Sequence, residues 1–246
     1  MTAHYIDTLR LAVIEGKWAE KFGELPRNIS VKPMFDFLSD ILKSNQHAYQ
    51  YEMVSDLHSL QFTIQRICQD AEIKIIYIGT HGTKNTIDFI NERVNYKIFG
   101  DMIVEQLHRS NKKIDGLYLG ACLIGNKRVA KYILEKTSNI KWIAGYSDEI
   151  DFTISSCFDL LFFRHYYYFY RNTVLTAADA MHYMDPFLIS ISGLMQTKME
   201  NQKDTERLSG NDVNFDHREI FPHPLGLGFG IFKSENGRIV DALRDF

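Results

Sequence analysis

The sequence predicts an α/β protein of three layers, with a mostly parallel central sheet, helices on both faces and an antiparallel hairpin near the C-terminus. Short apolar runs rich in β-branched residues alternate with segments whose apolar residues recur at helical spacing. Such alternation implies crossover connections between parallel strands that are buried on both faces. Two further runs flank the dipeptide Asn236-Gly237, which is a strong signal for a two-residue hairpin turn.

Strands and helices can be placed in order along the first third of the chain. The first predicted strand, Leu9–Ile14, is ended by Gly16, and the second is Ala48–Val54. Between them lies a helix whose apolar stripe is Met34, Phe37, Leu38, Ile41 and Leu42. A second helix follows, with Ser55 as its N-cap and with the stripe Leu57, Leu60, Ile64, Ile67 and Cys68.

The same alternation continues to about residue 171. Three more strands are predicted, at Ile73–Ile78, Ile114–Leu119 and Ile140–Tyr146. Three more helices are predicted, at Asp101–Arg109, Lys127–Lys136 and Phe152–Arg171. In the last of these helices we expect an inward face made of Ile154, Cys157, Phe158, Leu161 and Phe162.

The C-terminal part has a different character. Residues 196–219 are densely charged and poor in large apolar side chains, so they predict a loop or insertion. The hairpin strands are predicted at Leu227–Lys233 and Arg238–Leu243.

Composition restricts the class of protein. The length of 246 residues, with 45% apolar and 24% charged residues, predicts a single globular domain over residues 1–246. A net charge of −3 gives no overall signal for nucleic acid or an anionic membrane surface. Charged residues interrupt Ile150–Tyr170, the most apolar stretch, so we expect no membrane span.

The cysteines and the first residues indicate a compartment. Three cysteines, at positions 68, 122 and 157, are too few for a disulfide framework, and none of their spacings is that of a metal site. Asp7 lies among the first ten residues, which is not the pattern of a signal peptide. We therefore expect a cytoplasmic protein in a reducing environment, with Cys68 and Cys157 in the core.

Two of the predicted strands end in small residues followed by a reactive side chain. One runs into Thr80, His81 and Gly82, and the other runs through Gly120 and Ala121 into Cys122. Ligands of open α/β sheets bind beyond the carboxyl ends of the strands, so His81 and Cys122 are expected to meet there. A thiolate is a nucleophile, and a nearby imidazole can move the proton that a leaving amine requires. The backbone N–H groups of Gly82 and Cys122 are candidates for an oxyanion hole.

This pattern resembles the caspase-like (clan CD) cysteine peptidases, which include caspases, metacaspases, gingipain-like enzymes and CHAT-type domains. The resemblance rests on the ends of two apolar strands. The first strand ends in His81-Gly82, and the later one ends in Ala121-Cys122. The caspase signature has Gln where this chain has Gly120, so the resemblance is to a divergent, prokaryotic-type member. It covers roughly residues 9–170 and implies the three-layer caspase-like fold and a cysteine endopeptidase with His81 as acid/base and Cys122 as nucleophile.

The resemblance also implies where a substrate would bind. The segment after the strand Ile140–Tyr146 corresponds to one wall of the S1 pocket, which holds the side chain at P1, the residue before the scissile bond. Asp148, Glu149 and Asp151 follow that strand, so they are candidates for binding a P1 lysine or arginine. The implied partner is a protein or peptide substrate, with no metal or organic cofactor. Activation is expected to be regulated, and residues 196–219 are the candidate loop for it.

Two other functions remain open from the sequence. The first is a catalytically inactive adaptor or scaffold with this fold, which would bind a regulatory protein partner. Retention of both His81 and Cys122 favours the peptidase over it. The second is a flavodoxin-like nucleotide binder, which the lack of a glycine-rich phosphate loop after Ile14 disfavours. The alternating Gly226, Gly228 and Gly230 lack the helix that a dinucleotide loop requires.

Overall fold

A seven-stranded sheet forms the centre of the protein. The computed structural model describes residues 10–16, 30–42, 49–172 and 228–242, without the side chains of residues 165 and 168–172. Within these ranges the strand order is β10-β9-β8-β7-β3-β1-β2. The parallel strands are β1 (Leu11–Gly16), β2 (Tyr49–Val54), β3 (Ile75–Gly79), β7 (Ile114–Gly120) and β8 (Ile140–Tyr146). The antiparallel hairpin is β9 (Phe229–Glu235) and β10 (Arg238–Asp241).

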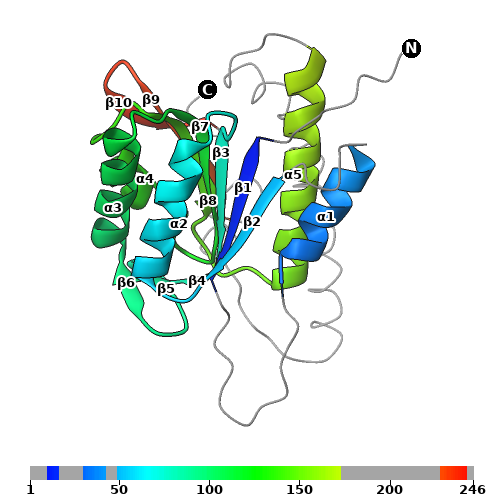
Figure 1. Cartoon of the computed structure of the whole chain (residues 1–246), viewed down its shortest axis with the longest axis horizontal. Coiled ribbons are helices and arrows are strands. Elements are labelled where there is room, and N and C mark those ends of the chain that lie inside the picture. The colour runs from blue at the N-terminus through cyan, green and yellow to red at the C-terminus, as the bar shows by residue number, and fades with distance from the viewer. Residues whose placement is uncertain (1–9, 17–29, 43–48, 173–227, 243–246) are drawn as a thin grey trace, which may run out of the picture.

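Helices cover both faces of this sheet (Figure 1). One face carries α1 (Lys32–Ile41) and α5 (Phe152–Asn172). The opposite face carries α2 (Leu57–Gln69), α3 (Tyr96–Arg109) and α4 (Lys127–Leu134). The predicted three-layer architecture with a mostly parallel sheet and a C-terminal hairpin is therefore confirmed. In the described part of the chain, no helix is both long enough and apolar enough to cross a membrane.

The two faces of the sheet bury different kinds of side chain. Successive residues of a strand point to opposite faces, and Ile76 and Leu117 pack with the helices α2, α3 and α4 in a largely aliphatic core. Their neighbours Tyr77 and Tyr118 pack with α1 and α5 in a core rich in aromatic rings. These two tyrosine rings are paired across β3 and β7 and stack with centroids 5.2 Å apart. The α5 side of the sheet therefore carries the phenol groups.

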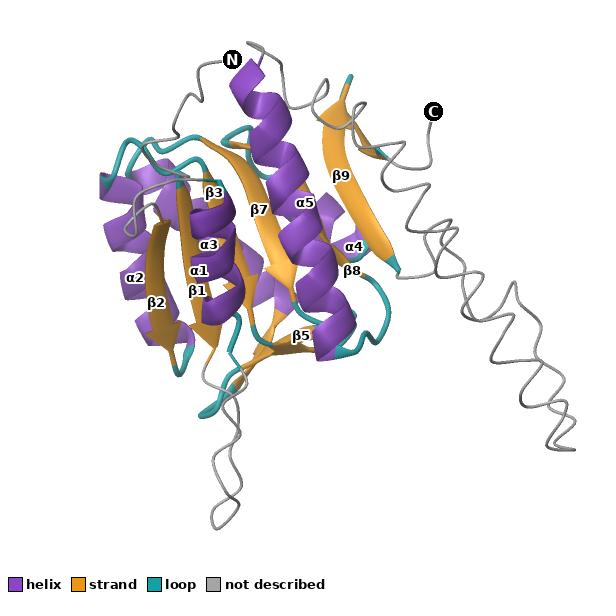
Figure 2. Cartoon of the chain, turned by 90° about the vertical axis from the view of Figure 1, so that its right-hand side faces the viewer, coloured by secondary structure: helices purple, strands orange, loops and turns teal. Residues whose placement is uncertain are grey.

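The carboxyl ends of the parallel strands share one end of the molecule. In Figure 2 the arrowheads of β1, β2 and β7 point to the end at which β5 lies. A small second sheet there has the order β4-β5-β6, with β4 at His81–Gly82, β5 at Thr86–Asp88 and β6 at Arg93–Asn95. The sequence analysis did not predict these strands, because segments of two or three residues are too short to show alternation.

Helix α1 buries a different stripe from the predicted one. Phe37 is 54% exposed and Ile41 is 39% exposed, whereas Phe35 is fully buried. The buried stripe is Val31, Phe35, Leu38 and Leu42. Both sets recur at helical spacing, and packing against the aromatic face of the sheet selects the second.

Two other local predictions were wrong. The N-cap of α2 is Asp56 rather than Ser55, because the Asp56 carboxylate accepts a hydrogen bond from the Ser59 N–H at 2.7 Å. Cys157 is exposed on α5, whereas Cys68 is buried as predicted. The hairpin turn is confirmed, since Asn236 and Gly237 have φ values of 50° and 76°, as a two-residue turn requires. The charged segment 196–219 lies outside the described residues.

Candidate active site

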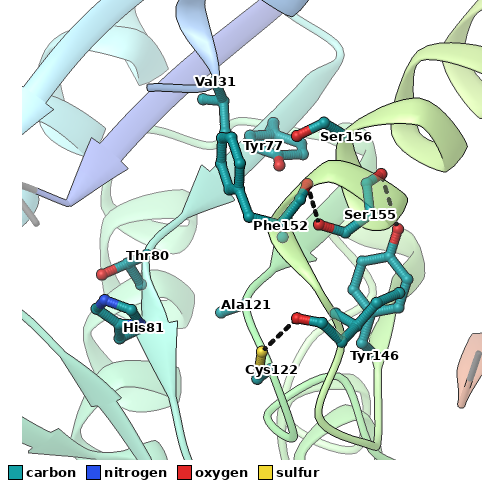
Figure 3. Close-up of a pocket in the computed structure, with 12 residues that line it drawn as sticks. Val31, Tyr77, Thr80, His81, Ala121, Cys122, Tyr146, Phe152, Ser155 and Ser156 are labelled. Carbon is teal, nitrogen blue, oxygen red and sulfur yellow. Dashed lines mark hydrogen bonds between the residues drawn. The ribbon is translucent and has the colours of Figure 1, made fainter. Parts of the chain in front are cut away.

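The register of the sheet brings the two reactive side chains to one place. Gly79 of β3 pairs with Gly120 of β7, and His81 and Cys122 each lie two residues beyond this pair. Both line a pocket of about 220 Å³. Figure 3 shows His81 and Cys122 on two sides of it, with Ala121 between them. The residues around the pocket are Val31, Tyr77, Thr80, His81, Gly120, Ala121, Cys122, Tyr146, Ile150, Phe152, Ser155 and Ser156.

Cys122 lines this pocket, and its backbone lies next to Gly82. Its Sγ donates a hydrogen bond to the Ile150 carbonyl oxygen at 3.5 Å (Figure 3). A methyl group added to Gly82 would lie 2.7 Å from the Cys122 carbonyl oxygen, so a larger residue does not fit there. The two residues predicted to supply oxyanion N–H groups are thus in direct contact, and their role stays a prediction.

The loop after Cys122 is fastened to the end of β8. Leu123 has a φ of 66°, and its N–H donates to the Asp148 carbonyl oxygen at 3.2 Å. The Gly125 N–H donates to the Tyr146 carbonyl oxygen at 2.9 Å. Asn126 caps α4 and donates through Nδ2 to the Leu123 carbonyl oxygen at 2.8 Å. These bonds fix the backbone that carries the thiol. They also hold Leu123 in the left-handed backbone region, which few residues other than glycine adopt.

His81 has a carboxylate as its neighbour in the small sheet. Asp88 of β5 pairs with His81 of β4, and Arg93 Nε donates to the Asp88 side chain at 3.0 Å. His81 is exposed overall, but desolvation where it borders the pocket lowers the pKa of its imidazole, and the charge of Asp88 partly offsets this. The imidazole is therefore neutral at pH 7 and can accept a proton. Asp88 could not be predicted from the sequence pattern, because its strand is only three residues long.

Substituting Asp88 with asparagine should lower the pKa of His81 further. The Asp88 carboxylate attracts the imidazolium form, so its removal makes protonation less favourable. NMR titration of the His81 ring protons measures the pKa directly. Asp151→Asn serves as a control that removes a carboxylate belonging to a helix cap. An unchanged or raised His81 pKa in Asp88→Asn would contradict this assignment.

The acidic residues predicted to bind a P1 cation are close in sequence to Ile150, which lines the pocket. Asp151 caps α5, since its Oδ1 accepts from the N–H groups of Thr153 at 2.8 Å and Ile154 at 3.1 Å. The Asp148 carboxylate lies against the backbone of Gly228, where an added methyl group would be 2.4 Å from Oδ2. The described pocket lining includes neither of them, nor Glu149. Their role in substrate binding stays a prediction.

A buried carboxylate that the sequence analysis did not identify lies behind the pocket. Asp159 of α5 is 2% exposed, and it accepts hydrogen bonds from the hydroxyls of Tyr77, Tyr118 and Tyr146. Burial raises the pKa of Asp159 to about 6, against the opposing effect of the three hydrogen bonds. Burial and the charge of Asp159 raise the pKa of all three tyrosines well above their usual value, so they stay protonated. The sequence feature that could have indicated this carboxylate is an aspartate among the apolar residues of the predicted helix Phe152–Arg171.

The described residues contain no group of three or more His, Cys, Asp or Glu side chains arranged to hold a metal ion.

Comparison with known proteins gives distant structural likenesses. No protein-family model matches this chain, and no curated protein matches it. It is similar to a secreted C11 cysteine protease from Bacteroides thetaiotaomicron, iotapain, at 8% identity and a TM-score of 0.38, over 60% of this chain and 54% of that one. It is also similar to caspase-1 from Spodoptera frugiperda, at 15% identity and a TM-score of 0.34, over 58% of this chain and 62% of that one.

These likenesses concern the fold. The match spans less than two thirds of either solved chain. The first of these solved proteins is a secreted cysteine protease and the second is a caspase. The described residues form the predicted three-layer α/β arrangement, and its caspase-like character stays an expectation from the sequence. At these identities and TM-scores the likeness assigns neither a residue nor an activity to this chain.

Proposed function

We propose that this protein is a cysteine endopeptidase that uses Cys122 and His81. The observation that carries the proposal is the register of β3 and β7, which delivers both side chains to one pocket at the same step beyond Gly79 and Gly120. An adaptor needs neither a thiol nor an imidazole at such a pocket, whereas this chain has both. A neutral imidazole and a thiol that line the same pocket are the two groups that general-base activation requires.

The chemistry follows from these two groups. The His81 imidazole takes the thiol proton as Cys122 Sγ attacks the carbonyl carbon of the scissile peptide. The N–H groups of Gly82 and Cys122 stabilise the resulting oxyanion. When the C–N bond breaks, the imidazolium gives its proton to the leaving amine, and a thioester remains. Water then attacks the thioester, His81 takes a proton from it, and the acid and the free thiol are released.

The substrate is a protein or peptide, with a preference for lysine or arginine at P1. Asp148 and Asp151 are the candidates for this preference that come from the sequence. Regulated activation and a cytoplasmic location belong to the same proposal. None of the steps above requires a metal ion or an organic cofactor.

Thiol labelling tests this function on the intact chain. A peptide with arginine at P1 and a thiol-reactive ketone in place of the scissile bond should modify Cys122 alone, as read by mass spectrometry of proteolytic fragments. Free iodoacetamide should modify the exposed Cys157 and spare the buried Cys68. Because Cys157 is the more accessible thiol, a probe that labels Cys122 in preference to it reports recognition. Labelling confined to Cys157, or none at all, would reject the peptidase.

A further inference from the structure

His81 and Cys122 both lie beyond the end of the central sheet. The pairing of β3 with β7 stops at Gly79 and Gly120, two residues before each of them. His81 continues into the hairpin of β4 and β5, and Cys122 continues into the loop that leads to α4. The separation of the two side chains therefore depends on contacts between that hairpin and that loop.

Asn126, the N-cap of α4, joins the two segments. Its Nδ2 donates to the Leu123 carbonyl oxygen at 2.8 Å, in the loop after Cys122, and to the Lys84 carbonyl oxygen at 3.4 Å, in the turn between β4 and β5 (residues 83–85). The side-chain amide carries two hydrogens, so it can make both bonds at once. One side chain thus connects the nucleophile loop with the hairpin of His81.

Arg128, in the first turn of α4, makes a second link to the same turn. Its Nη2 donates to the Lys84 carbonyl oxygen at 2.6 Å and also to Asn85 Oδ1. The guanidinium carbon lies 5.2 Å from the centroid of the Tyr96 ring, and aromatic faces attract cations. The Tyr96 N–H in turn donates to the Asn85 carbonyl oxygen at 2.8 Å. The ring that supports the guanidinium is therefore anchored to the turn that the guanidinium holds.

We propose that Asn126 and Arg128 set the separation of His81 and Cys122 by fastening the β4–β5 turn to the loop after Cys122. The inference rests on the proposed peptidase function and assigns two positioning residues to it. The described pocket lining includes neither of them, so they act through the turn and the loop rather than by contact with a substrate.

The turn is connected by side-chain hydrogen bonds to the carboxylate next to His81. The hydroxyls of Thr83 and Thr86 share a hydrogen bond of 2.8 Å, and Thr86 Oγ1 donates to Asp88 Oδ1 at 2.8 Å. The Thr83 hydroxyl also accepts from the N–H groups of Asn85 at 3.2 Å and Thr86 at 3.1 Å. A movement of Asn85 therefore disturbs a chain of bonds that ends at Asp88, the residue paired with His81.

The two segments also touch directly at Gly82. A methyl group added to Gly82 would lie 2.7 Å from the Cys122 carbonyl oxygen and 3.3 Å from Ile124 Cβ, so β4 and the nucleophile loop pack closely. Lys84, which accepts from both Asn126 and Arg128, lies two residues after Gly82. The bonds from α4 hold the chain at that point and so keep this backbone contact closed.

Arg128→Ala should lower kcat about ten- to a hundredfold and leave KM nearly unchanged, because a displacement of about 1 Å between reacting groups can cost a factor of about 10² in rate. The pocket that binds the substrate keeps its lining in this variant. Lys131→Ala is the matched control, since Lys131 is an exposed cation of the same helix whose ion-pair partner is Glu135 at 3.7 Å. Its kcat should stay at the wild-type value. Kinetics with a fluorogenic peptide measure both constants.

Stability and rescue separate positioning from a purely structural role. The bonds from Arg128 to the turn lie at the exposed surface, so their loss should lower Tm only slightly. Arg128→Lys keeps the charge but lacks the forked donors of a guanidinium, so its kcat should stay low. Added methylguanidinium should raise the kcat of Arg128→Ala, an effect that loss of stability alone would not produce. A wild-type kcat in Arg128→Lys would contradict the role of the guanidinium.

Asn126→Asp tests the side-chain amide without removing the helix cap. Asn126 Oδ1 accepts from the Val129 N–H at 3.1 Å, and aspartate is an equally good N-cap. The variant loses both bonds that Nδ2 donates, so kcat should fall while Tm, followed by circular dichroism, changes little. A kcat at the wild-type value would contradict the role of Asn126.

The backbone amide NMR signals of Gly82 and Cys122 give a readout that needs no turnover. Arg128→Ala should shift both signals, because the two backbones are in contact and the turn beyond Gly82 is released. Lys131→Ala should shift neither. Unchanged signals in a folded Arg128→Ala protein would overturn the inference.

These outcomes separate the inference from the function on which it rests. A wild-type protein that cleaves no peptide and takes no probe at Cys122 would reject the peptidase, and the amide signals would still decide whether α4 positions the two segments. A wild-type protein that cleaves peptides, with unchanged kcat and amide signals in Arg128→Ala, would retain the peptidase and overturn the inference.

Discussion

Replacing Cys122 with alanine should abolish peptide cleavage and leave the fold intact. Removal of a nucleophile typically costs a factor of about 10⁴ or more in kcat. The side chain lines a pocket and is only partly buried, so its truncation leaves no closed cavity. The free energy of unfolding should therefore stay within about 1 kcal/mol of the wild-type value. Cleavage of a fluorogenic peptide and urea denaturation measure the two quantities.

The other two cysteines provide matched controls for this substitution. Cys68 packs in the aliphatic core, so Cys68→Ala should lower the stability by about 1–2 kcal/mol and leave turnover unchanged. Cys157 is exposed, and Cys157→Ala should change neither quantity. If Cys68→Ala or Cys157→Ala lost turnover at full stability while Cys122→Ala retained activity, the nucleophile would be a residue other than Cys122.

Replacing Gly125 with alanine should strongly destabilise the protein. The added methyl group would lie 2.3 Å from both the Gly145 carbonyl carbon and the Tyr146 nitrogen. Backbone of a central strand has no room to move, so the loop carrying Cys122 must shift instead and lose the Gly125–Tyr146 hydrogen bond. We expect a loss of about 3 kcal/mol or more, which corresponds to a fall in Tm of about 6–12 °C for a chain of this size.

Gly237 gives the control that separates crowding from backbone conformation. It lies in the hairpin turn with a φ of 76°, and an added methyl group there would meet nothing within 4 Å. Gly237→Ala should therefore cost only the conformational penalty of about 1 kcal/mol. Thermal unfolding of both variants by circular dichroism provides the comparison. Equal losses would show that the close approach of Gly125 to β8 is not the dominant effect.

The sequence by itself determined which segments form the central sheet and where the reactive pair lies along it. Continuous apolar runs rich in β-branched residues and their terminal glycines are local signals, and they located the strands that end at Gly79 and Gly120. Since parallel strands share their carboxyl edge, the positions of His81 and Cys122 beyond those glycines were sufficient to bring them to one pocket. The Asn236-Gly237 turn was equally local, because its residue types fix the required backbone angles.

Only the tertiary structure decided which of several equivalent local patterns is used. Helix α1 has two overlapping apolar stripes, and burial of Phe35 rather than Phe37 depends on the sheet against which it packs. Asp151 follows β8 as expected, yet its carboxylate caps α5, since unpaired N–H groups at a helix start compete for any nearby acceptor.

The hydrogen-bond partners of Asp159 were likewise decided only by the tertiary structure. Its hydroxyl partners Tyr77, Tyr118 and Tyr146 lie 82, 41 and 13 residues away in sequence, on three different strands. Hydrophobic periodicity predicts which elements form, but the partners of a buried carboxylate are set by the packing of one helix across several strands. A local pattern contains no information about that packing, so the carboxylate behind the pocket became visible only in the folded chain.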